Sequence, residues 1–103
     1  NVSSHLSSLT VHGSSHNPNH RIYDAYSSSK TALNAFTVLL AKEFQDTNFK
    51  INSVAPGYTA TSLNQFKGTQ TTAEAAQVIV KYAVLDSDGP TGKLFGKDGE
   101  IAW

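Results

Sequence analysis

Residues 26–44 read YSSSKTALNAFTVLLAKEF, and the rest of the chain is organised around this stretch. Its apolar residues recur at three- and four-residue spacing, which predicts a helix from Tyr26 to Phe44. More apolar residues widen that stripe, so we expect the helix to be buried on more than one side. The stripe comprises Leu33, Phe36, Leu40, Ala41 and Phe44, widened by Ala32, Ala35, Val38 and Leu39.

Tyr26 and Lys30 stand four residues apart at the start of this helix, so they lie on one face. A phenol has a pKa near about 10 in water. An ammonium group held close to it favours the phenolate and lowers that pKa, which suits acid–base chemistry. The alternative is that both side chains only extend into solvent from an exposed face. A five-residue pattern alone does not decide between the two.

Strands are predicted on either side of the helix. Asn1-Val2-Ser3-Ser4 is typical of the end of a strand, and residues 49–55 form an apolar stretch that ends at Pro56-Gly57. Between the first strand and the helix, residues 5–20 are rich in Ser, His, Asn, Gly and Pro, which predicts a long loop.

A second helix and a third strand follow. Residues 58–70 are polar, with a brief helical possibility at 62–66. Thr71-Thr72-Ala73-Glu74 fits a capping box and opens a helix that ends before Asp86. A short strand at residues 92–96 leads into a turn. The order of strand, helix, strand, helix, strand predicts an α/β fold with a parallel sheet and flanking helices.

Composition narrows the classes of function. The chain has 103 residues, 39% hydrophobic residues, no Cys and a formal net charge of zero. These values fit one small domain in a reducing compartment, and we expect a cytoplasmic protein. Scattered basic residues and the lack of a long apolar run predict no nucleic-acid partner and no membrane partner. The first residue is not Met, and we expect a piece of a longer protein.

Groups suited to catalysis fall at one edge of the predicted sheet. In open parallel sheets, ligands bind beyond the carboxyl ends of the strands. Ser4 follows the first strand, Tyr26 and Lys30 open the next helix, and Pro56-Gly57 ends the second strand. This convergence of a hydroxyl, a phenol with its ammonium and a backbone turn favours a catalytic site.

The same segments resemble the short-chain dehydrogenase/reductase family. Asn1-Val2-Ser3-Ser4 is similar to the family's serine-bearing strand, and Tyr26-Ser27-Ser28-Ser29-Lys30 to its Tyr-x-x-x-Lys helix. Residues 51–61, INSVAPGYTAT, are similar to its Asn-x-(Val/Ile)-x-Pro-Gly-x-x-x-Thr segment. The resemblance covers nearly the whole chain in the right order. It implies the C-terminal half of a Rossmann-type, doubly wound parallel sheet, with residues 1–103 as the catalytic part of one domain.

The resemblance implies an NAD(P)-dependent oxidoreductase that transfers a hydride between a nicotinamide cofactor and a small carbonyl or alcohol. Tyr26 would be the general acid or base, Lys30 would bind the nicotinamide ribose, and Ser4 would bind the substrate oxygen, with Ser3 as the alternative serine. The other cofactor-binding residues would be Pro56, Gly57, Thr59 and Thr61.

Some family features are not in these 103 residues. The glycine-rich phosphate turn and the residue that selects NAD or NADP would precede Asn1, so we expect the chain alone to be inactive. Likeness to carbonyl-reductase-like members favours NADP(H) over NAD(H). The separation between Ser4 and Tyr26 exceeds the family's usual one, as in monomeric members, and the oligomeric state stays open. The alternative function is a non-catalytic interaction or remnant module that retains half of the fold.

His12, His16 and His20 are spaced by four residues, as metal ligands on a helix would be. Gly13, Asn17, Pro18 and Asn19 interrupt that stretch, so no helix is expected to present them together. We predict no metal site.

Overall fold

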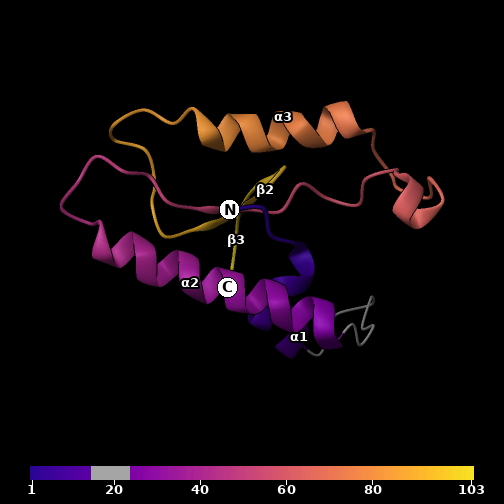
Figure 1. Cartoon of the computed structure of the whole chain (residues 1–103), viewed down its shortest axis with the longest axis horizontal. Helices are drawn as coiled ribbons and strands as arrows, with labels where there is room; N and C mark the ends of the chain where they lie inside the picture. Colours follow the sequence, from indigo (N-terminus) through magenta and orange to yellow (C-terminus); the bar gives the residue numbers. More distant parts are fainter. Residues whose placement is uncertain (15–23) are drawn as a thin grey trace.

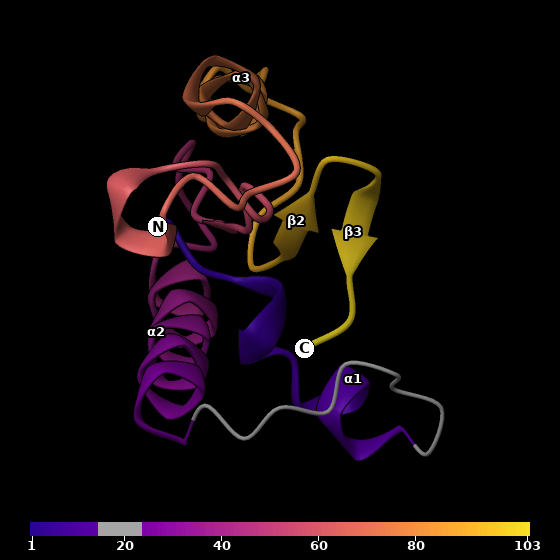
Figure 2. The ribbon, with the colours of Figure 1, turned by 90° about the vertical axis from the view of Figure 1, so that its right-hand side faces the viewer.

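The computed structural model describes residues 1–14 and 24–103. A small sheet lies between two long helices, α2 and α3, which cover its opposite faces (Figures 1 and 2). This arrangement is a three-layer α/β fold, as the sequence predicts. The elements are η1 (His5–Ser7), α1 (Leu9–Gly13), α2 (Asp24–Glu43), β1 (Ser53–Val54), η2 (Ser62–Asn64), α3 (Thr72–Ala83), β2 (Leu94–Gly96) and β3 (Gly99–Ile101).

The sheet has the order β1-β2-β3, and the chain's first residues extend it beyond β1. Strands β1 and β2 are parallel, with Ser53 opposite Leu94. Val2 forms an isolated parallel bridge with Val54, so the segment around Val2 lies outside β1. β3 pairs with β2 in the antiparallel direction, whereas the sequence predicted parallel strands only. The turn that joins them uses Gly99 at φ +123°, a conformation that favours glycine.

The connections before and after β1 differ in hand. Helix α2 joins the Val2 segment to β1, and α3 joins β1 to β2, while the two helices lie on opposite faces (Figure 2). Because the three segments are parallel and succeed one another across the sheet, opposite faces require connections of opposite hand. Right-handed crossovers are the strong rule for such units, so one of these is the rare left-handed form. The long segment 55–71 gives the chain the length to cross to the other face.

Helix α2 packs on the sheet through polar residues, contrary to the predicted apolar stripe. Asn34 and Thr37 are 4% and 0% exposed, whereas Phe36 and Leu39 are 54% and 70% exposed. The Thr37 hydroxyl shares a 2.8 Å hydrogen bond with that of Ser53 in β1 and accepts one of 2.7 Å from Asn1 Nδ2. These bonds fix which face turns inward. The expectation that the apolar stripe buries this helix on more than one side was therefore wrong.

Part of the predicted loop at residues 5–20 is helical instead. The Ser4 hydroxyl accepts a hydrogen bond from the Leu6 N–H and caps η1, and the Ser8 hydroxyl accepts one from the Val11 N–H and caps α1. Serine caps of this kind satisfy backbone donors that a short helix leaves free. Residues 15–20 of the predicted loop lie outside the described residues.

Other elements follow the prediction. α2 spans nearly the expected range, η2 occupies the helical possibility at 62–66, and Thr71 and Glu74 form the capping box of α3. Hydrogen bonds from Thr71 hold the pKa of Glu74 below its ordinary value. The strand predicted at 49–55 is regular only at its end. The buried apolar side chains are Ala41, Val54, Ala55, Ala75, Val78, Leu94 and Phe95.

In the described part of the chain, no helix has both the length and the apolar character that crossing a membrane requires.

Candidate active site

Tyr26 and Lys30 lie together on the first turns of α2. Lys30 Nζ is 5.9 Å from the centroid of the Tyr26 ring and donates a 3.1 Å hydrogen bond to the carbonyl of Val2. That bond links the ammonium group to the Val2 segment, just before Ser3 and Ser4. The Tyr26 side chain is 48% exposed, and its hydroxyl has no hydrogen-bond partner among residues 1–14 and 24–103. The phenol is therefore accessible to a small molecule.

The two adjacent serines have different environments. Ser3 is 3% exposed and its hydroxyl donates to Asn34 Oδ1 at 2.7 Å, inside the protein. Ser4 is partly exposed, and its hydroxyl accepts from the Leu6 N–H at 3.2 Å. Since accepting this bond leaves the Ser4 proton free to be donated, Ser4 is the better suited of the two to bind a substrate oxygen. No hydrogen bond joins Ser4 to Tyr26 or Lys30 within the described ranges.

The turn after β1 holds the other predicted residues in a closed loop. Gly57 has φ +99°, and a Cβ there would lie 2.8 Å from Gln70 Nε2. Gln70 Nε2 donates to the Pro56 carbonyl and, at 3.2 Å, to the Thr59 hydroxyl. Asn64 Nδ2 donates to the Thr59 carbonyl at 2.8 Å. Only glycine fits this turn, and the loop brings its backbone close to Gln70.

Gly68 allows the loop of residues 57–70 to pass close to its own backbone at Thr59 and Ala60. A Cβ at Gly68 would lie 2.0 Å from the Ala60 nitrogen, which no side chain can tolerate. Residues Gln65 and Phe66 both adopt positive φ values, 55° and 58°, just before it. The segment thus depends on a close backbone contact, which the composition of residues 58–70 did not reveal.

Three residues of this region were not singled out from the sequence: Ser7, Asn34 and Gln70. Ser7 and Asn34 are buried and hydrogen-bonded to each other, at 2.7 Å between Asn34 Nδ2 and Ser7 Oγ. A signal for Asn34 did exist, because Thr31, Asn34 and Thr37 recur every three residues inside an apolar helix. Gln70 gave no signal of its own.

Of His12, His16 and His20, the structure describes His12. His12 Nε2 lies 2.9 Å from the Leu6 carbonyl oxygen, within hydrogen-bond distance. His16 and His20 lie outside the described residues. No group of metal-binding side chains occurs in residues 1–14 and 24–103.

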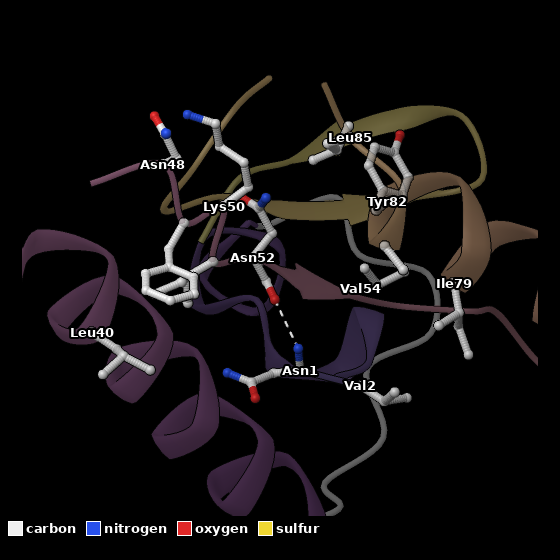
Figure 3. Close-up of a pocket in the computed structure, with 13 residues that line it drawn as sticks. Asn1, Val2, Leu40, Asn48, Lys50, Asn52, Val54, Ile79, Tyr82 and Leu85 are labelled. Atoms are coloured by element: carbon white, nitrogen blue, oxygen red, sulfur yellow. Dashed lines mark hydrogen bonds between the residues drawn. The ribbon is translucent and has the colours of Figure 1, made fainter. Parts of the chain in front are cut away.

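A hollow of about 420 Å³ opens at the sheet edge formed by Asn1 and Val2 (Figure 3). Leu40 of α2 and Ile79 and Tyr82 of α3 line it from either side of the sheet. In Figure 3, the amino group of Asn1 donates to the Asn52 carbonyl, at 2.9 Å. Tyr26, Lys30 and Ser4 do not line this hollow, so it is a separate feature from the candidate site.

Comparison with known proteins identifies the family of this chain. The family model described as short chain dehydrogenase matches residues 10–72, which include both side chains. The chain belongs to the short-chain dehydrogenase family. Enzymes of this family use NAD(H) or NADP(H) and are oxidoreductases.

Several of the named relatives are reductases. The chain is 45% identical to (-)-isopiperitenone reductase of Mentha piperita over 74 residues, which cover 72% of this chain and 23% of that protein. The carbonyl reductase Sniffer of D. melanogaster matches with a TM-score of 0.74 and 26% identity, over 100% of this chain and 40% of Sniffer. An NADPH-bound carbonyl reductase from chicken fatty liver has the same fold, with a TM-score of 0.74, 18% identity and coverage of 100% of this chain and 41% of that one.

Two consequences follow from these matches. The fold is that of Rossmann-type short-chain dehydrogenases. The chain spans about a quarter of the length of the isopiperitenone reductase and less than half of either carbonyl reductase.

Proposed function

We propose that this chain forms the catalytic part of an NAD(P)-dependent oxidoreductase, which transfers a hydride between a nicotinamide cofactor and a carbonyl or alcohol substrate. The observation that carries the proposal is the position of Lys30 Nζ, 5.9 Å from the Tyr26 ring centroid and hydrogen-bonded to Val2. A phenol and an ammonium group thus lie beside the turn that carries Ser4.

Each of the three side chains has a role in this proposal. Tyr26 gives its phenolic proton to the substrate oxygen in carbonyl reduction and takes it back in alcohol oxidation. Ser4 donates its hydroxyl proton to the same oxygen and stabilises the charge that develops there. Lys30 Nζ has three donors and uses one on the Val2 carbonyl, which leaves two for the ribose hydroxyls.

The turn after β1 fits the nicotinamide end of the cofactor. Gly57 has no side chain and is exposed, and Pro56, Thr59 and Thr61 flank it on a segment fastened by Gln70. We assign these four residues to the cofactor site, with the hydroxyl of Thr61 directed to the carboxamide or pyrophosphate. The bound nicotinamide supplies or accepts the hydride, and the protein supplies orientation and proton transfer.

We further propose that residues 1–103 are the C-terminal part of one Rossmann-like domain. The relatives are far longer than this chain. Val2 is 48% exposed at the outer edge of the sheet. An upstream segment that supplies the phosphate-binding turn would pair with this edge, and without it we expect no activity.

The assignments of the preferred cofactor and of the substrate class rest on likeness to known reductases. We propose NADP(H) as the preferred cofactor, which the NADPH-bound chicken enzyme of the same fold supports. The substrate is a small carbonyl or alcohol, as the name of the isopiperitenone reductase suggests for that relative. A cytoplasmic location fits a chain without cysteine.

The test is Tyr26→Phe in the natural polypeptide that contains this chain. The variant keeps the ring and loses the proton that Tyr26 transfers, so we expect turnover to fall by about 10²- to 10⁴-fold. Cofactor affinity, measured by fluorescence titration with NADPH and with NADH, should stay nearly unchanged. The same titrations on the wild type test the preference for NADP(H).

Tyr82→Phe is the matched control, because it makes the same chemical change away from the site. The Tyr82 hydroxyl donates only a 3.4 Å hydrogen bond to the Gly96 carbonyl, while its ring stacks on Phe95 at 4.3 Å. We expect this variant to keep its turnover. Unchanged turnover in Tyr26→Phe, or no turnover in the wild type with any aldehyde, ketone or alcohol tried, would favour the non-catalytic module instead.

A further inference from the structure

Three buried polar side chains form a hydrogen-bonded group next to the Ser4 backbone. We call Ser3, Ser7 and Asn34 the Asn34 cluster; they are 3%, 1% and 4% exposed. Ser3 Oγ is 2.7 Å from Asn34 Oδ1, and Asn34 Nδ2 is 2.7 Å from Ser7 Oγ. The Ser7 hydroxyl in turn donates to the Ser4 carbonyl. The cluster therefore connects helix α2 to the backbone of Ser4.

The chemistry of these groups allows one assignment of donors and acceptors. The Ser4 carbonyl can only accept, so the single proton of Ser7 points to it. Ser7 Oγ must then accept from Asn34, which places the amide nitrogen of Asn34 toward Ser7 and its oxygen toward Ser3. Ser3 donates its proton to that oxygen, and the two serine protons and the amide group are thus satisfied together. An amide at position 34 is the group that both donates and accepts here.

Asn34 is also aligned with the catalytic side chains. Tyr26, Lys30 and Asn34 follow one another at four-residue spacing, so they lie on one face of α2. Thr31 strengthens the link, because its hydroxyl lies 2.9 Å from the Ser7 carbonyl. Asn34 and Thr37 are turned inward, whereas Tyr26 at the start of the helix is half exposed and Phe36 and Leu39 on other faces are exposed.

Stability alone does not explain why the buried residues of the Asn34 cluster are polar. Burying polar groups carries a desolvation cost, and apolar residues of similar volume are often as stabilising. A closed hydrogen-bond network does hold its members in one arrangement. What this network holds is the Ser4 segment on one side and the Tyr26–Lys30 helix on the other.

We propose that Asn34 is a positioning residue, which sets the register between Ser4 and the Tyr26–Lys30 pair through Ser7. The proposal rests on the proposed function, since it concerns the same reaction. A shift of about 1 Å between groups that act on one substrate oxygen can lower a rate by about a hundredfold. Asn34 therefore affects turnover without touching substrate or cofactor.

Asn34→Asp in the natural polypeptide is the first test. Aspartate has the same shape and still accepts from Ser3, but it cannot donate to Ser7. We expect kcat to fall by about 10- to 100-fold, while the Kd for NADPH changes by less than about twofold, because Lys30 stays in place. Ser7→Ala breaks the same link without adding a charge, and we expect a smaller fall in kcat of the same kind. If Asn34→Asp does not fold, the kcat of Ser7→Ala is compared with that of the control variant instead.

Thr37→Val is the matched control. Thr37 lies about one turn further along α2, is 0% exposed and is hydrogen-bonded to Asn1 and Ser53, neither of which belongs to the site. It should lower the melting temperature and leave kcat within about twofold, because its bonds do not reach Ser4.

The outcomes separate the two proposals. A fall in kcat for the Asn34 and Ser7 variants no larger than that of Thr37→Val would overturn the positioning role and leave a purely structural cluster. The proposed function would still stand in that case, provided that the wild type is active and Tyr26→Phe is not. An inactive wild type would overturn both.

Discussion

Lys30 joins the Val2 segment to the helix that carries Tyr26. Its ammonium group donates to the Val2 carbonyl and lies over the Tyr26 ring, so the side chain that we propose to bind the ribose also links two segments of the fold. At the scale of the residue, a substitution of Lys30 can therefore distinguish a role in cofactor binding from a role in proton transfer.

Replacing Lys30 with Ala should weaken both cofactor binding and turnover. Each hydrogen bond from a charged donor contributes about 1.5–3 kcal/mol, so we expect the Kd for NADPH to rise by about 10- to 100-fold. Fluorescence titration of the natural polypeptide measures this directly. Lys42→Ala is the control, because Lys42 is exposed at the far end of α2 and, among the described residues, its ammonium group is hydrogen-bonded to Gln45. A loss of turnover with unchanged Kd would contradict the ribose role.

At the scale of the element, α3 is held at its start by a complete capping box. The Thr71 hydroxyl accepts from the Glu74 N–H at 3.2 Å, and the Glu74 carboxylate accepts from the Thr71 N–H at 2.7 Å. The Thr71 hydroxyl also lies 2.8 Å from that carboxylate, at donor distance. These bonds hold the pKa of Glu74 below its ordinary value near 4.5.

The capping box gives a prediction for stability and its dependence on pH. Thr71→Ala should lower the free energy of unfolding by about 1 kcal/mol at neutral pH. Because the pKa of Glu74 is lower in the folded state, its ionised form stabilises α3 above the ordinary pKa. That stabilisation is lost as the pH falls through the folded-state pKa. Urea unfolding across the acid range should therefore show a shallower loss in Glu74→Gln than in the wild type. Equal losses would contradict the assignment.

At the scale of the whole molecule, the chain has an open side. Val2 lies at an edge of the sheet with nearly half of its surface exposed, and the hollow beside it is lined from both helix layers. Phe49, Val80 and Val84 are 63%, 56% and 72% exposed. An unpaired strand edge next to exposed apolar side chains is a surface that proteins normally cover.

We therefore expect the protein made by its own cell to have an intact mass well over twice 11.0 kDa. The added residues would cover the Val2 edge and complete the dinucleotide site. Mass spectrometry of the native protein measures this, with titration of NADPH on the same sample. An intact mass near 11.0 kDa would mean that this half of the fold is the product, and that Tyr26 and Lys30 no longer serve catalysis.

Much of the architecture was readable from residue order. The Tyr-x-x-x-Lys spacing, the Pro56-Gly57 turn and the Thr71–Glu74 cap are local patterns, because each depends on residues a few positions apart. The same patterns predicted the α/β class, the range of α2 and the residues assigned to the site.

Only the tertiary structure decided the features that join distant segments. The choice of the polar face of α2 depends on Ser3, Ser7 and Ser53, which lie far from Asn34 and Thr37 in the sequence. The same holds for the closure of residues 57–70 by Gln70, and for the opposite faces that α2 and α3 cover. Helical periodicity counts apolar residues and cannot record which buried polar group will find a partner across the fold. That pairing forms only on folding; it leaves Phe36 exposed and links Asn34 through Ser7 to the Ser4 backbone.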